Sequence, residues 1–201
     1  MEITDLSPGG FASCCYLVTE GHDAVLVDCT ASAEVVREAL IEREAGLRAI
    51  VCTHGHFDHL LTADAVRRAL DVPLYIHSDD AELLTDGQKN AHAAFFGFDR
   101  VWRPAEQTFE DREVLRLGEI TLTVLHTPGH TRGSSVLLAD GVAFTGDTLF
   151  AGGIGRTDLY GGNAAALRRS LQALSALDGS LRIYPGHGDG TTLQHALNLL
   201  F

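Results

Sequence analysis

A dense group of histidines directly after an apolar run constrains this chain more than any other feature. Residues 52–59 hold three histidines and one aspartate, and they follow residues 48–51, a run typical of a buried strand. Side chains two apart in extended backbone point the same way, so His54 and His56 can hold one metal ion together. Asp58 and His59 lie beyond the turn, where they can hold a second ion or orient water. The alternative, a polar helix start with exposed histidines, accounts poorly for three histidines in six positions.

Length and composition describe an ordinary globular protein. The 201 residues suit one domain spanning 1–201, and 45% hydrophobic with 21% charged residues is untypical of a disordered or fibrous chain. The formal net charge is −12, and the 15 lysines and arginines are scattered. Because phosphate neutralisation needs clustered basic side chains, we expect no nucleic-acid partner. An anionic membrane surface is disfavoured for the same reason.

The start of the chain and its cysteines bear on the compartment. The N-terminus carries acidic residues where a signal peptide carries basic ones, and no run approaches the roughly 18 apolar residues of a membrane span. We therefore expect a cytoplasmic protein. No CxxC spacing occurs, which favours buried thiols over a zinc or redox role, with an oxidation-sensitive Cys52 as the alternative. The four cysteines are Cys14, Cys15, Cys29 and Cys52.

Strand-like runs alternate with helical patterns along the chain. Three pairs of apolar runs flank turn residues and predict hairpins: 16–18 with 24–27, 114–117 with 121–125, and 135–138 with 142–144. Further strands are predicted at 48–52, 73–77 and 181–184, and helices at 32–44, 58–70, 81–84, 164–177 and 191–200. For residues 88–104, which hold aromatic residues without clear periodicity, we expect an ordered loop or short helix near the site. Two halves of this kind predict an α/β fold, a four-layer αββα sandwich of two mixed β-sheets flanked by helices.

Three later motifs place more ligand types at strand ends. His130 follows the strand 121–125 after a Pro-Gly turn, and His187 follows the strand 181–184 in the same way. Asp147 follows Gly146 at the end of another strand, and its two oxygens could bridge two ions. Taken singly, each motif is more often an ordinary turn. Their agreement with the first group predicts one site built from several strand ends.

Five motifs that keep their order over nearly the whole chain resemble those of the metallo-β-lactamase superfamily. They are THGHFDH at 53–59, TPGHT at 127–131, TGDTLF at 145–150, GIGRTD at 153–158 and PGHG at 185–188. Within the superfamily, the chain is most similar to the glyoxalase II-like, hydroxyacylglutathione hydrolase group, especially its short bacterial members. The resemblance implies a first metal held by His54, His56 and His130, a second held by Asp58, His59 and His187, and Asp147 bridging them.

The same resemblance implies a metallo-hydrolase acting on ester or thioester bonds, with a small-molecule acyl-thioester such as hydroxyacylglutathione as its partner. Two divalent ions, zinc first with iron or manganese as alternatives, would supply a bridging hydroxide, and Asp58 would orient it or accept its proton. Full-length glyoxalase II carries a C-terminal helical segment with basic residues for glutathione, whereas this sequence stops 14 residues past His187. Glutathione binding is therefore left open. Arg156 could contact substrate or pair with Asp158.

Other classes remain as alternatives. The persulfide dioxygenases of the superfamily share the HxHxDH and GRTD motifs but use one iron, here held by His54, His130 and Asp147. They depart from the PGHG motif that contains His187, which favours the hydrolase. A β-lactamase should carry an export signal, and the nucleases carry basic surfaces or additional domains. A non-enzymatic metal-binding module is disfavoured because a structural zinc closes its shell with four ligands, and this chain offers seven.

Two further features are assigned minor roles. The small residues of 164–177 and the apolar residues 199–201 could support a homo-oligomer, although a helix packed on its own sheet is the simpler interpretation. Five histidines have no motif support as ligands, and of these His77, at a strand end, is the one most expected to line the pocket. The five are His22, His77, His92, His126 and His195.

Overall fold

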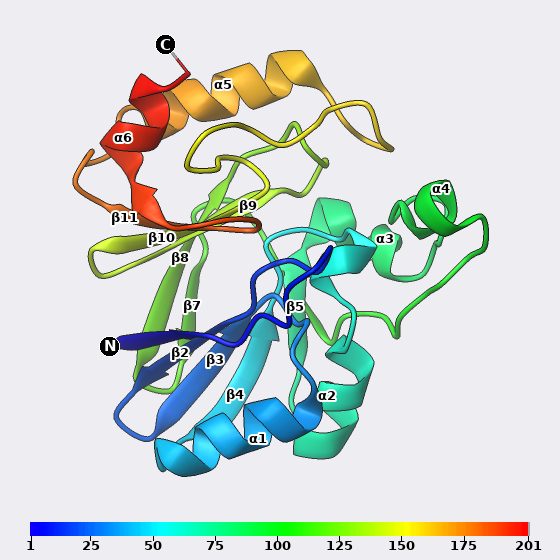
Figure 1. Ribbon diagram of the computed structural model, residues 1–201, viewed down its shortest axis with the longest axis vertical. Helices are drawn as coiled ribbons and strands as arrows, with labels where there is room; N and C mark the ends of the chain where they lie inside the picture. Colours follow the sequence, from blue (N-terminus) through cyan, green and yellow to red (C-terminus); the bar gives the residue numbers. More distant parts are fainter. Residues whose placement is uncertain (201) are drawn as a thin grey trace.

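Two six-stranded sheets lie face to face in the computed structural model, which describes residues 1–200 (Figure 1). The first sheet has the order β1 (Glu2–Asp5), β2 (Tyr16–Glu20), β3 (Asp23–Val27), β4 (Gly46–Val51), β5 (Leu74–His77), β6 (Gln107–Phe109). The second has the order β12 (Thr191–Thr192), β11 (Arg182–Pro185), β10 (Val142–Gly146), β9 (Ser135–Ala139), β8 (Ile120–His126), β7 (Val114–Leu117). Both sheets mix parallel and antiparallel pairs, and the three predicted hairpins are the pairs β2/β3, β7/β8 and β9/β10.

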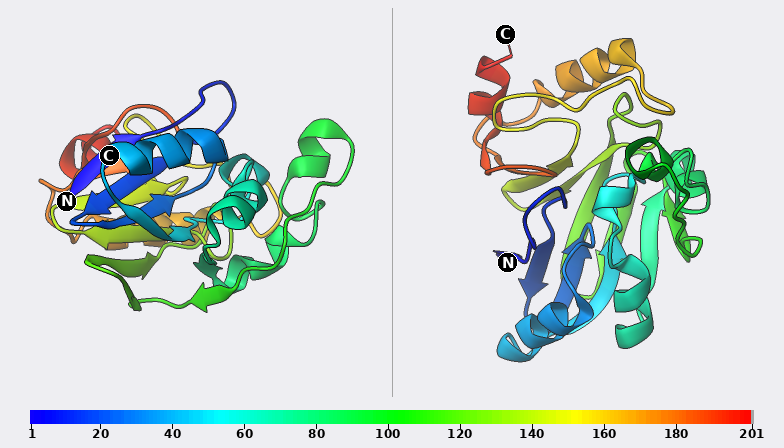
Figure 2. Two further views of the ribbon diagram at one scale, coloured as in Figure 1. Left: turned by 90° about the horizontal axis from the view of Figure 1, so that it is seen from below. Right: turned by 45° about the vertical axis from the view of Figure 1, so that its right-hand side comes forward.

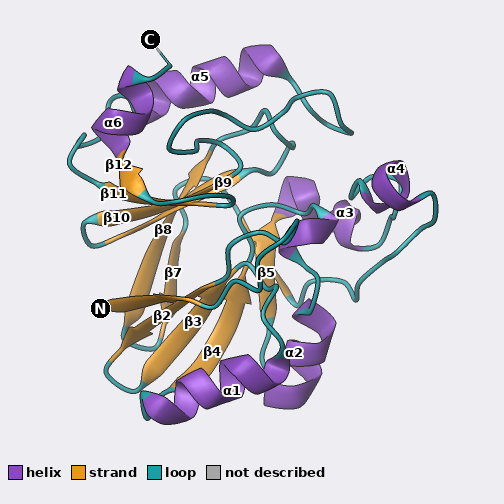
Figure 3. Cartoon of the chain, viewed as in Figure 1, coloured by secondary structure: helices purple, strands orange, loops and turns teal. Residues whose placement is uncertain are grey.

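Helices cover the outer face of each sheet (Figures 1 and 3). The first sheet carries α1 (Ala33–Glu42) and α2 (Ala63–Leu70), and the second carries α5 (Ala164–Leu174) and α6 (Leu193–Asn198). The short helices α3 (Ala81–Leu84) and α4 (His92–Phe96) lie to one side of this sandwich (Figure 2). The predicted four-layer αββα arrangement is therefore confirmed.

Strand β3 shows why the layers form. Alternate side chains of a strand point to opposite faces, and every residue of β3 is buried. Val25 and Val27 pack between the two sheets, while Ala24 and Leu26 face α1 and α2. A strand that is covered on both faces reads as a continuous apolar run rather than an alternating one. A third core cluster lies between the second sheet and its helices.

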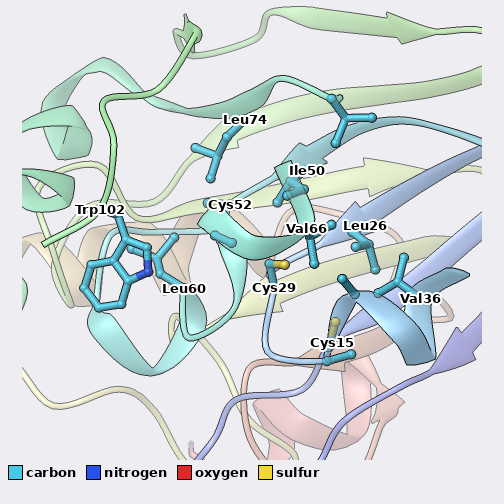
Figure 4. Packing of buried hydrophobic residues seen from close by; sticks show 14 of the residues in the cluster. Cys15, Leu26, Cys29, Val36, Ile50, Cys52, Leu60, Val66, Leu74 and Trp102 are labelled. Atoms are coloured by element: carbon cyan, nitrogen blue, oxygen red, sulfur yellow. The ribbon is translucent and has the colours of Figure 1, made fainter. Parts of the chain in front are cut away.

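Helix α1 begins where the sequence predicts a cap. The Ser32 hydroxyl accepts a hydrogen bond from the Val35 amide at 3.3 Å, which satisfies one of the free donors of the first turn. Val36 and Leu40, at helical spacing, are buried against the first sheet. Figure 4 shows this packing, with Val36 beside Leu26.

All four cysteines are free and buried, as the sequence predicts. Cys15, Cys29 and Cys52 are fully buried in the core of the first sheet (Figure 4). Burial raises the pKa of Cys15 to about 11. Burial also raises the pKa of Cys52, and the negative charge of Asp28 adds to that shift. A thiol of this kind is a poor nucleophile at neutral pH.

The predicted helix over 58–70 is wrong in its first turn. A short 3₁₀ turn spans Phe57–His59, and α2 begins only at Ala63. Between them the chain is tied to the loop after β3, because the Thr62 amide and hydroxyl donate to the Cys29 and Ala31 carbonyls at 3.2 and 2.6 Å. These tertiary bonds replace helical ones and leave Asp58 and His59 turned toward the site.

The sequence analysis did not predict three of the edge strands. β1, β6 and β12 are two to four residues long and show no clear alternation of apolar side chains. The predicted helix over 191–200 is shorter than expected, because residues 191–192 form β12 and Thr192 caps α6 by accepting from the His195 amide at 3.3 Å. Phe201, part of the apolar end considered for self-association, lies outside the described residues. None of the described helices is long and apolar enough to cross a bilayer.

Candidate metal centre

The carboxyl ends of four strands bring the predicted site residues together. His54 and His56 follow β4, and His130 follows β8. Asp147 follows β10, and His187 follows β11. Loops at strand ends are the usual place for functional side chains because a rigid sheet positions them. All seven predicted residues lie within three overlapping clusters of potential ligand atoms.

The first cluster contains His54, His56 and His130, which are all at least 97% buried. Nδ1 of His56 lies 2.8 Å from Nε2 of His130 and 3.2 Å from Nε2 of His54. Three imidazole nitrogens thus converge on one point. A divalent ion of the zinc or iron type is the natural occupant of such a point.

The second cluster contains Asp58, His59 and His187. Nε2 of His187 lies 3.3 Å from Oδ2 of Asp58, and the two rings of His59 and His187 have centroids 5.4 Å apart. His59 is fully buried, whereas the side chain of His187 is 35% exposed. The second cluster is therefore the more open of the two.

Asp147 lies between the clusters. Its Oδ2 is 3.5 Å from Nε2 of His130, and its Oδ1 is 3.3 Å from Nε2 of His59 and 3.8 Å from Nε2 of His187. One carboxylate oxygen thus faces each group of imidazoles. This is the arrangement expected of a carboxylate that bridges two ions.

Buried atoms without partners test whether the site fits a metal. Nε2 of His59 and Oδ1 of Asp147 are buried and have no hydrogen-bond partner among the described residues. Buried polar atoms normally have partners, and a metal-free cluster would leave these groups desolvated at a cost of about 1–3 kcal/mol each. The two atoms face each other between the clusters. Their chemistry and position fit divalent metal ions.

Charge distribution within the site follows from burial and from the neighbouring carboxylates. Burial lowers the pKa of His54 well below its usual range and, together with the proximity of His130, lowers that of His56 to about 3. Burial also opposes the charged form of His59, but Asp28 and Asp147 outweigh it and raise its pKa. The imidazoles of His54 and His56 are thus neutral, which is the state that binds metal.

Two buried carboxylates outside the clusters hold the histidine loops in place. Asp28 accepts from Nδ1 of His59 at 2.7 Å and from the Thr53 amide at 2.8 Å. Such a contact fixes the tautomer of His59 and directs its Nε2 into the site. The sequence prediction missed Asp28, although the signal was present, because Asp28 directly follows the apolar run 24–27 as the other site residues follow theirs.

Asp80 joins the two loops of the first cluster. Its carboxylate accepts from the Gly55 amide at 3.0 Å, between His54 and His56. It also accepts from the Thr131 hydroxyl and the Gly133 amide at 2.7 Å each, directly after His130. Burial raises the pKa of Asp80, and these donors oppose that shift. The sequence carries no signal for this role, since Asp80 lies in an ordinary acidic pair.

A cavity of about 530 Å³ opens above the clusters. Its floor contains His56, Asp58, His130, Asp147 and His187. The apolar residues of its walls are Phe11, Phe57, Ala91, Phe95, Phe96, Phe150 and Leu159, with Gly155 and Arg156 completing the lining. The segment 88–104, expected near the site, supplies the wall residues of α4.

Arg156 pairs with Asp158, one of the two roles that the sequence left open, and it also lines the cavity. Its Nε and a terminal nitrogen donate to the two oxygens of Asp158 at 2.7 and 2.8 Å, and its side chain lines the cavity. Its carbonyl accepts from Nδ1 of His130 at 2.7 Å, which points Nε2 of that ring into the site. The GIGRTD loop therefore orients a residue of the first cluster.

His77 does not line the cavity, contrary to the sequence expectation. Its ring stacks on that of His126 with centroids 4.0 Å apart, at the end of β5. His92 is also structural, because its Nδ1 bonds to the Phe98 carbonyl at 2.8 Å. His22 and His195 lie outside the clusters, in agreement with the prediction.

Comparison with known proteins identifies the fold family. Residues 8–187 match the family model described as Metallo-beta-lactamase superfamily. The chain belongs to this superfamily. Among the relatives with hydrolase names, a probable metallo-hydrolase, YqgX, of Bacillus subtilis is 34% identical, covering 88% of this chain and 85% of its own. The hydroxyacylglutathione hydrolase GloC of Haemophilus influenzae is 30% identical, covering 96% of this chain and 93% of its own.

Solved structures agree with the superfamily assignment. The structure of the BLEG-1 B3 metallo-beta-lactamase is 30% identical with a TM-score of 0.90, covering 98% of this chain and 97% of that chain. TTHA1623, solved in a di-iron-bound form, is 32% identical with a TM-score of 0.80, and the match covers 96% of each chain. The chain thus belongs to a metallo-hydrolase superfamily, and its histidine and aspartate clusters are suited to divalent metals.

Proposed function

We propose that the protein hydrolyses thioesters with the help of two divalent metal ions. The observation that carries the proposal is the position of Asp147, which faces both the first and the second cluster. It lies on the floor of a cavity large enough for a small substrate. The name of the relative GloC supports the thioester bond as the target.

Seven side chains would hold the ions. His54, His56 and His130 would hold the first, Asp58, His59 and His187 the second, and Asp147 both. When bound, two such ions supply a Lewis acid for the carbonyl oxygen and lower the pKa of water toward about 7. Zinc is our first choice, and the di-iron form of TTHA1623 supports iron as the alternative.

Asp58 is the side chain that would manage the proton. It lies on the cavity floor, and its Oδ2 is oriented by Nε2 of His187. Burial opposes its ionisation, but the contact with His187 lowers its pKa, so the carboxylate is charged and able to accept a proton from water. The water oxygen forms a bond to the acyl carbon, the carbon–sulfur bond breaks, and the departing sulfur takes the proton from Asp58. The products are a carboxylic acid and a thiol.

Hydrolysis of S-lactoylglutathione and of simpler acyl thioesters by the metal-loaded protein tests this proposal. We expect Asp58→Ala and His56→Ala to lower kcat/KM by about 10²–10⁴-fold, the range for losing a proton acceptor or a metal ligand. His22→Ala serves as the matched control, because His22 is exposed and lies outside the clusters. Activity that survives both site substitutions unchanged would contradict the proposal.

Metal content separates the hydrolase from the persulfide dioxygenase considered above. The dioxygenase needs only His54, His130 and Asp147, whereas this chain also assembles Asp58, His59 and His187 within ligand distance of one another. We expect two metal ions per chain in protein purified without added metal. One iron per chain, with oxygen uptake on glutathione persulfide, would favour the dioxygenase instead.

A further inference from the structure

The walls of the cavity differ sharply in chemistry from its floor. Four phenylalanines form one packed group at the mouth, with Phe57 at its centre. The Phe57 ring lies 5.5 Å from both Phe95 and Phe96 and 6.3 Å from Phe11, measured between centroids. Phe11 and Phe96 are themselves 5.9 Å apart. These contacts make the wall one continuous aromatic surface.

Three of these rings are unusually exposed for their size. Phe11 is 61% exposed, Phe95 55% and Phe96 46%. Exposed aromatic side chains that are clustered, rather than scattered, mark a place where an apolar ligand binds. Here the cluster is continuous with the cavity above the reactive groups, so a bound substrate would cover it.

The charges of the cavity point the same way. Arg156 is the one arginine or lysine among the described lining residues, and Asp158 already engages it with two hydrogen bonds. The guanidinium also lies 5.8 Å from the centroid of the Phe95 ring. The acidic lining side chains, Asp58 and Asp147, lie on the floor, where they would hold the metal ions of the proposed function. Away from the floor, an anionic group would therefore find no free cationic side chain among the described lining residues.

Glutathione is a poor match for such a surface. It carries two carboxylates, and placing a carboxylate against an apolar wall without a cationic partner is costly. An uncharged alkyl or aryl group on the same sulfur loses no ionic hydration and buries apolar area, at about 25 cal/mol per Å².

Resting on the function proposed above, we infer that the substrates are uncharged thioesters whose thiol half is apolar and packs on Phe57, Phe95 and Phe96. The aromatic wall would then select the substrate, while the floor carries out the hydrolysis. Phe96 is the clearest test position, since it belongs to the wall and its partial exposure lets a longer side chain reach solvent.

A pair of substrates with the same acyl group tests the inference. S-benzyl thioacetate and S-acetylglutathione differ only in the thiol half. We expect the metal-loaded protein to show a kcat/KM at least about tenfold higher for the benzyl compound. In Phe96→Lys this ratio should fall at least about tenfold, because the new ammonium attracts the carboxylates of glutathione and interrupts the wall. Phe11→Lys, at a still more exposed ring, should act in the same direction.

Val101→Lys is the matched control. Val101 is 53% exposed and close in sequence, but it does not line the cavity. The same change of charge there should leave the substrate ratio within about twofold of the unmodified protein. An unmodified protein that prefers S-acetylglutathione, or a ratio that Phe96→Lys leaves unchanged, would overturn the inference.

Dye binding gives a readout that does not depend on catalysis. N-phenyl-1-naphthylamine, a neutral dye that fluoresces in apolar surroundings, should bind the protein and be displaced by dibenzyl sulfide but not by S-methylglutathione. Displacement by S-methylglutathione alone would overturn the inference. Failure to hydrolyse either thioester, with displacement by dibenzyl sulfide intact, would instead overturn the proposed reaction and support the apolar site.

Discussion

The orientation of single side chains in this site depends on groups outside the two clusters. Asp28 directs His59, the Arg156 carbonyl directs His130, and Asp80 ties the loops that carry the first cluster. Each contact uses a strong acceptor for a buried donor, so removing it leaves that donor without a partner. The positions of the clustered side chains therefore depend on these surrounding hydrogen-bond acceptors.

Substitution of Asp28 tests whether its contact with His59 supports metal binding. Asp28→Asn keeps the size of the side chain but removes the charge that faces Nδ1 of His59. We expect metal affinity to fall by about 10–100-fold, the usual effect of losing such a partner. Competition with a chromogenic chelator measures this change. Asp140→Asn, at an exposed turn, should leave the affinity as it was, and equal affinities for both variants would contradict the role assigned to Asp28.

At the scale of elements, the ends of strands decide where the clusters form. β10 and β11 pair in parallel with an irregularity between Phe144 and Gly146, which brings the Asp147 loop beside the His187 loop. Close approach of these loops needs a residue without a side chain at position 186. A Cβ at Gly186 would overlap Oδ1 of Asp147 and lie 2.7 Å from Cε1 of His59.

Gly186→Ala should therefore damage the site more than the fold. We expect it to displace Asp147, to lower metal affinity at least about tenfold and to destabilise the fold by about 1–3 kcal/mol, the usual cost of overpacking. Metal content after dialysis and urea unfolding measure the two effects. Gly152→Ala is the control, since a Cβ there meets nothing within 4 Å. Similar metal retention in both variants would argue against the crowding at position 186.

At the scale of the whole molecule, the site joins the two sheets. His54, His56 and His59 follow strand β4 of the first sheet, whereas His130, Asp147 and His187 follow strands of the second. Bound metal ions would thus connect the halves of the sandwich at one edge. A ligand that binds only the folded state stabilises that state by mass action.

Removal of metal should for this reason lower the melting temperature. A metal present at about 100 times its Kd contributes about 2.7 kcal/mol. In a chain of this length each kcal/mol shifts Tm by about 2–4 °C, so chelation should lower Tm by about 5–10 °C. Differential scanning calorimetry before and after chelation, with zinc added back, measures the shift. An unchanged Tm would mean that the folded chain binds no metal and would contradict the proposed centre.

The layers of the fold and the candidate metal ligands could be predicted from the sequence because both follow local rules. Apolar runs of strand length, helical spacing after a cap such as Ser32, and a ligand type at each strand end are properties of neighbouring residues. The helix over 58–70 was wrong in its first turn for a different reason. Hydrogen bonds from Thr62 to a distant loop outweighed the local helical preference there.

Only the tertiary structure determines how the metal-binding side chains are arranged relative to one another. Asp147 between two clusters, Asp80 between two loops and the Phe57 wall all join residues that lie far apart in the chain. Such contacts depend on sheet register and loop approach, which composition and spacing do not specify. The kinds of chemistry were therefore present in the sequence. Their geometry came from the packing of the two sheets, and the apolar character of the cavity came from the loops and the helix α4 beside them.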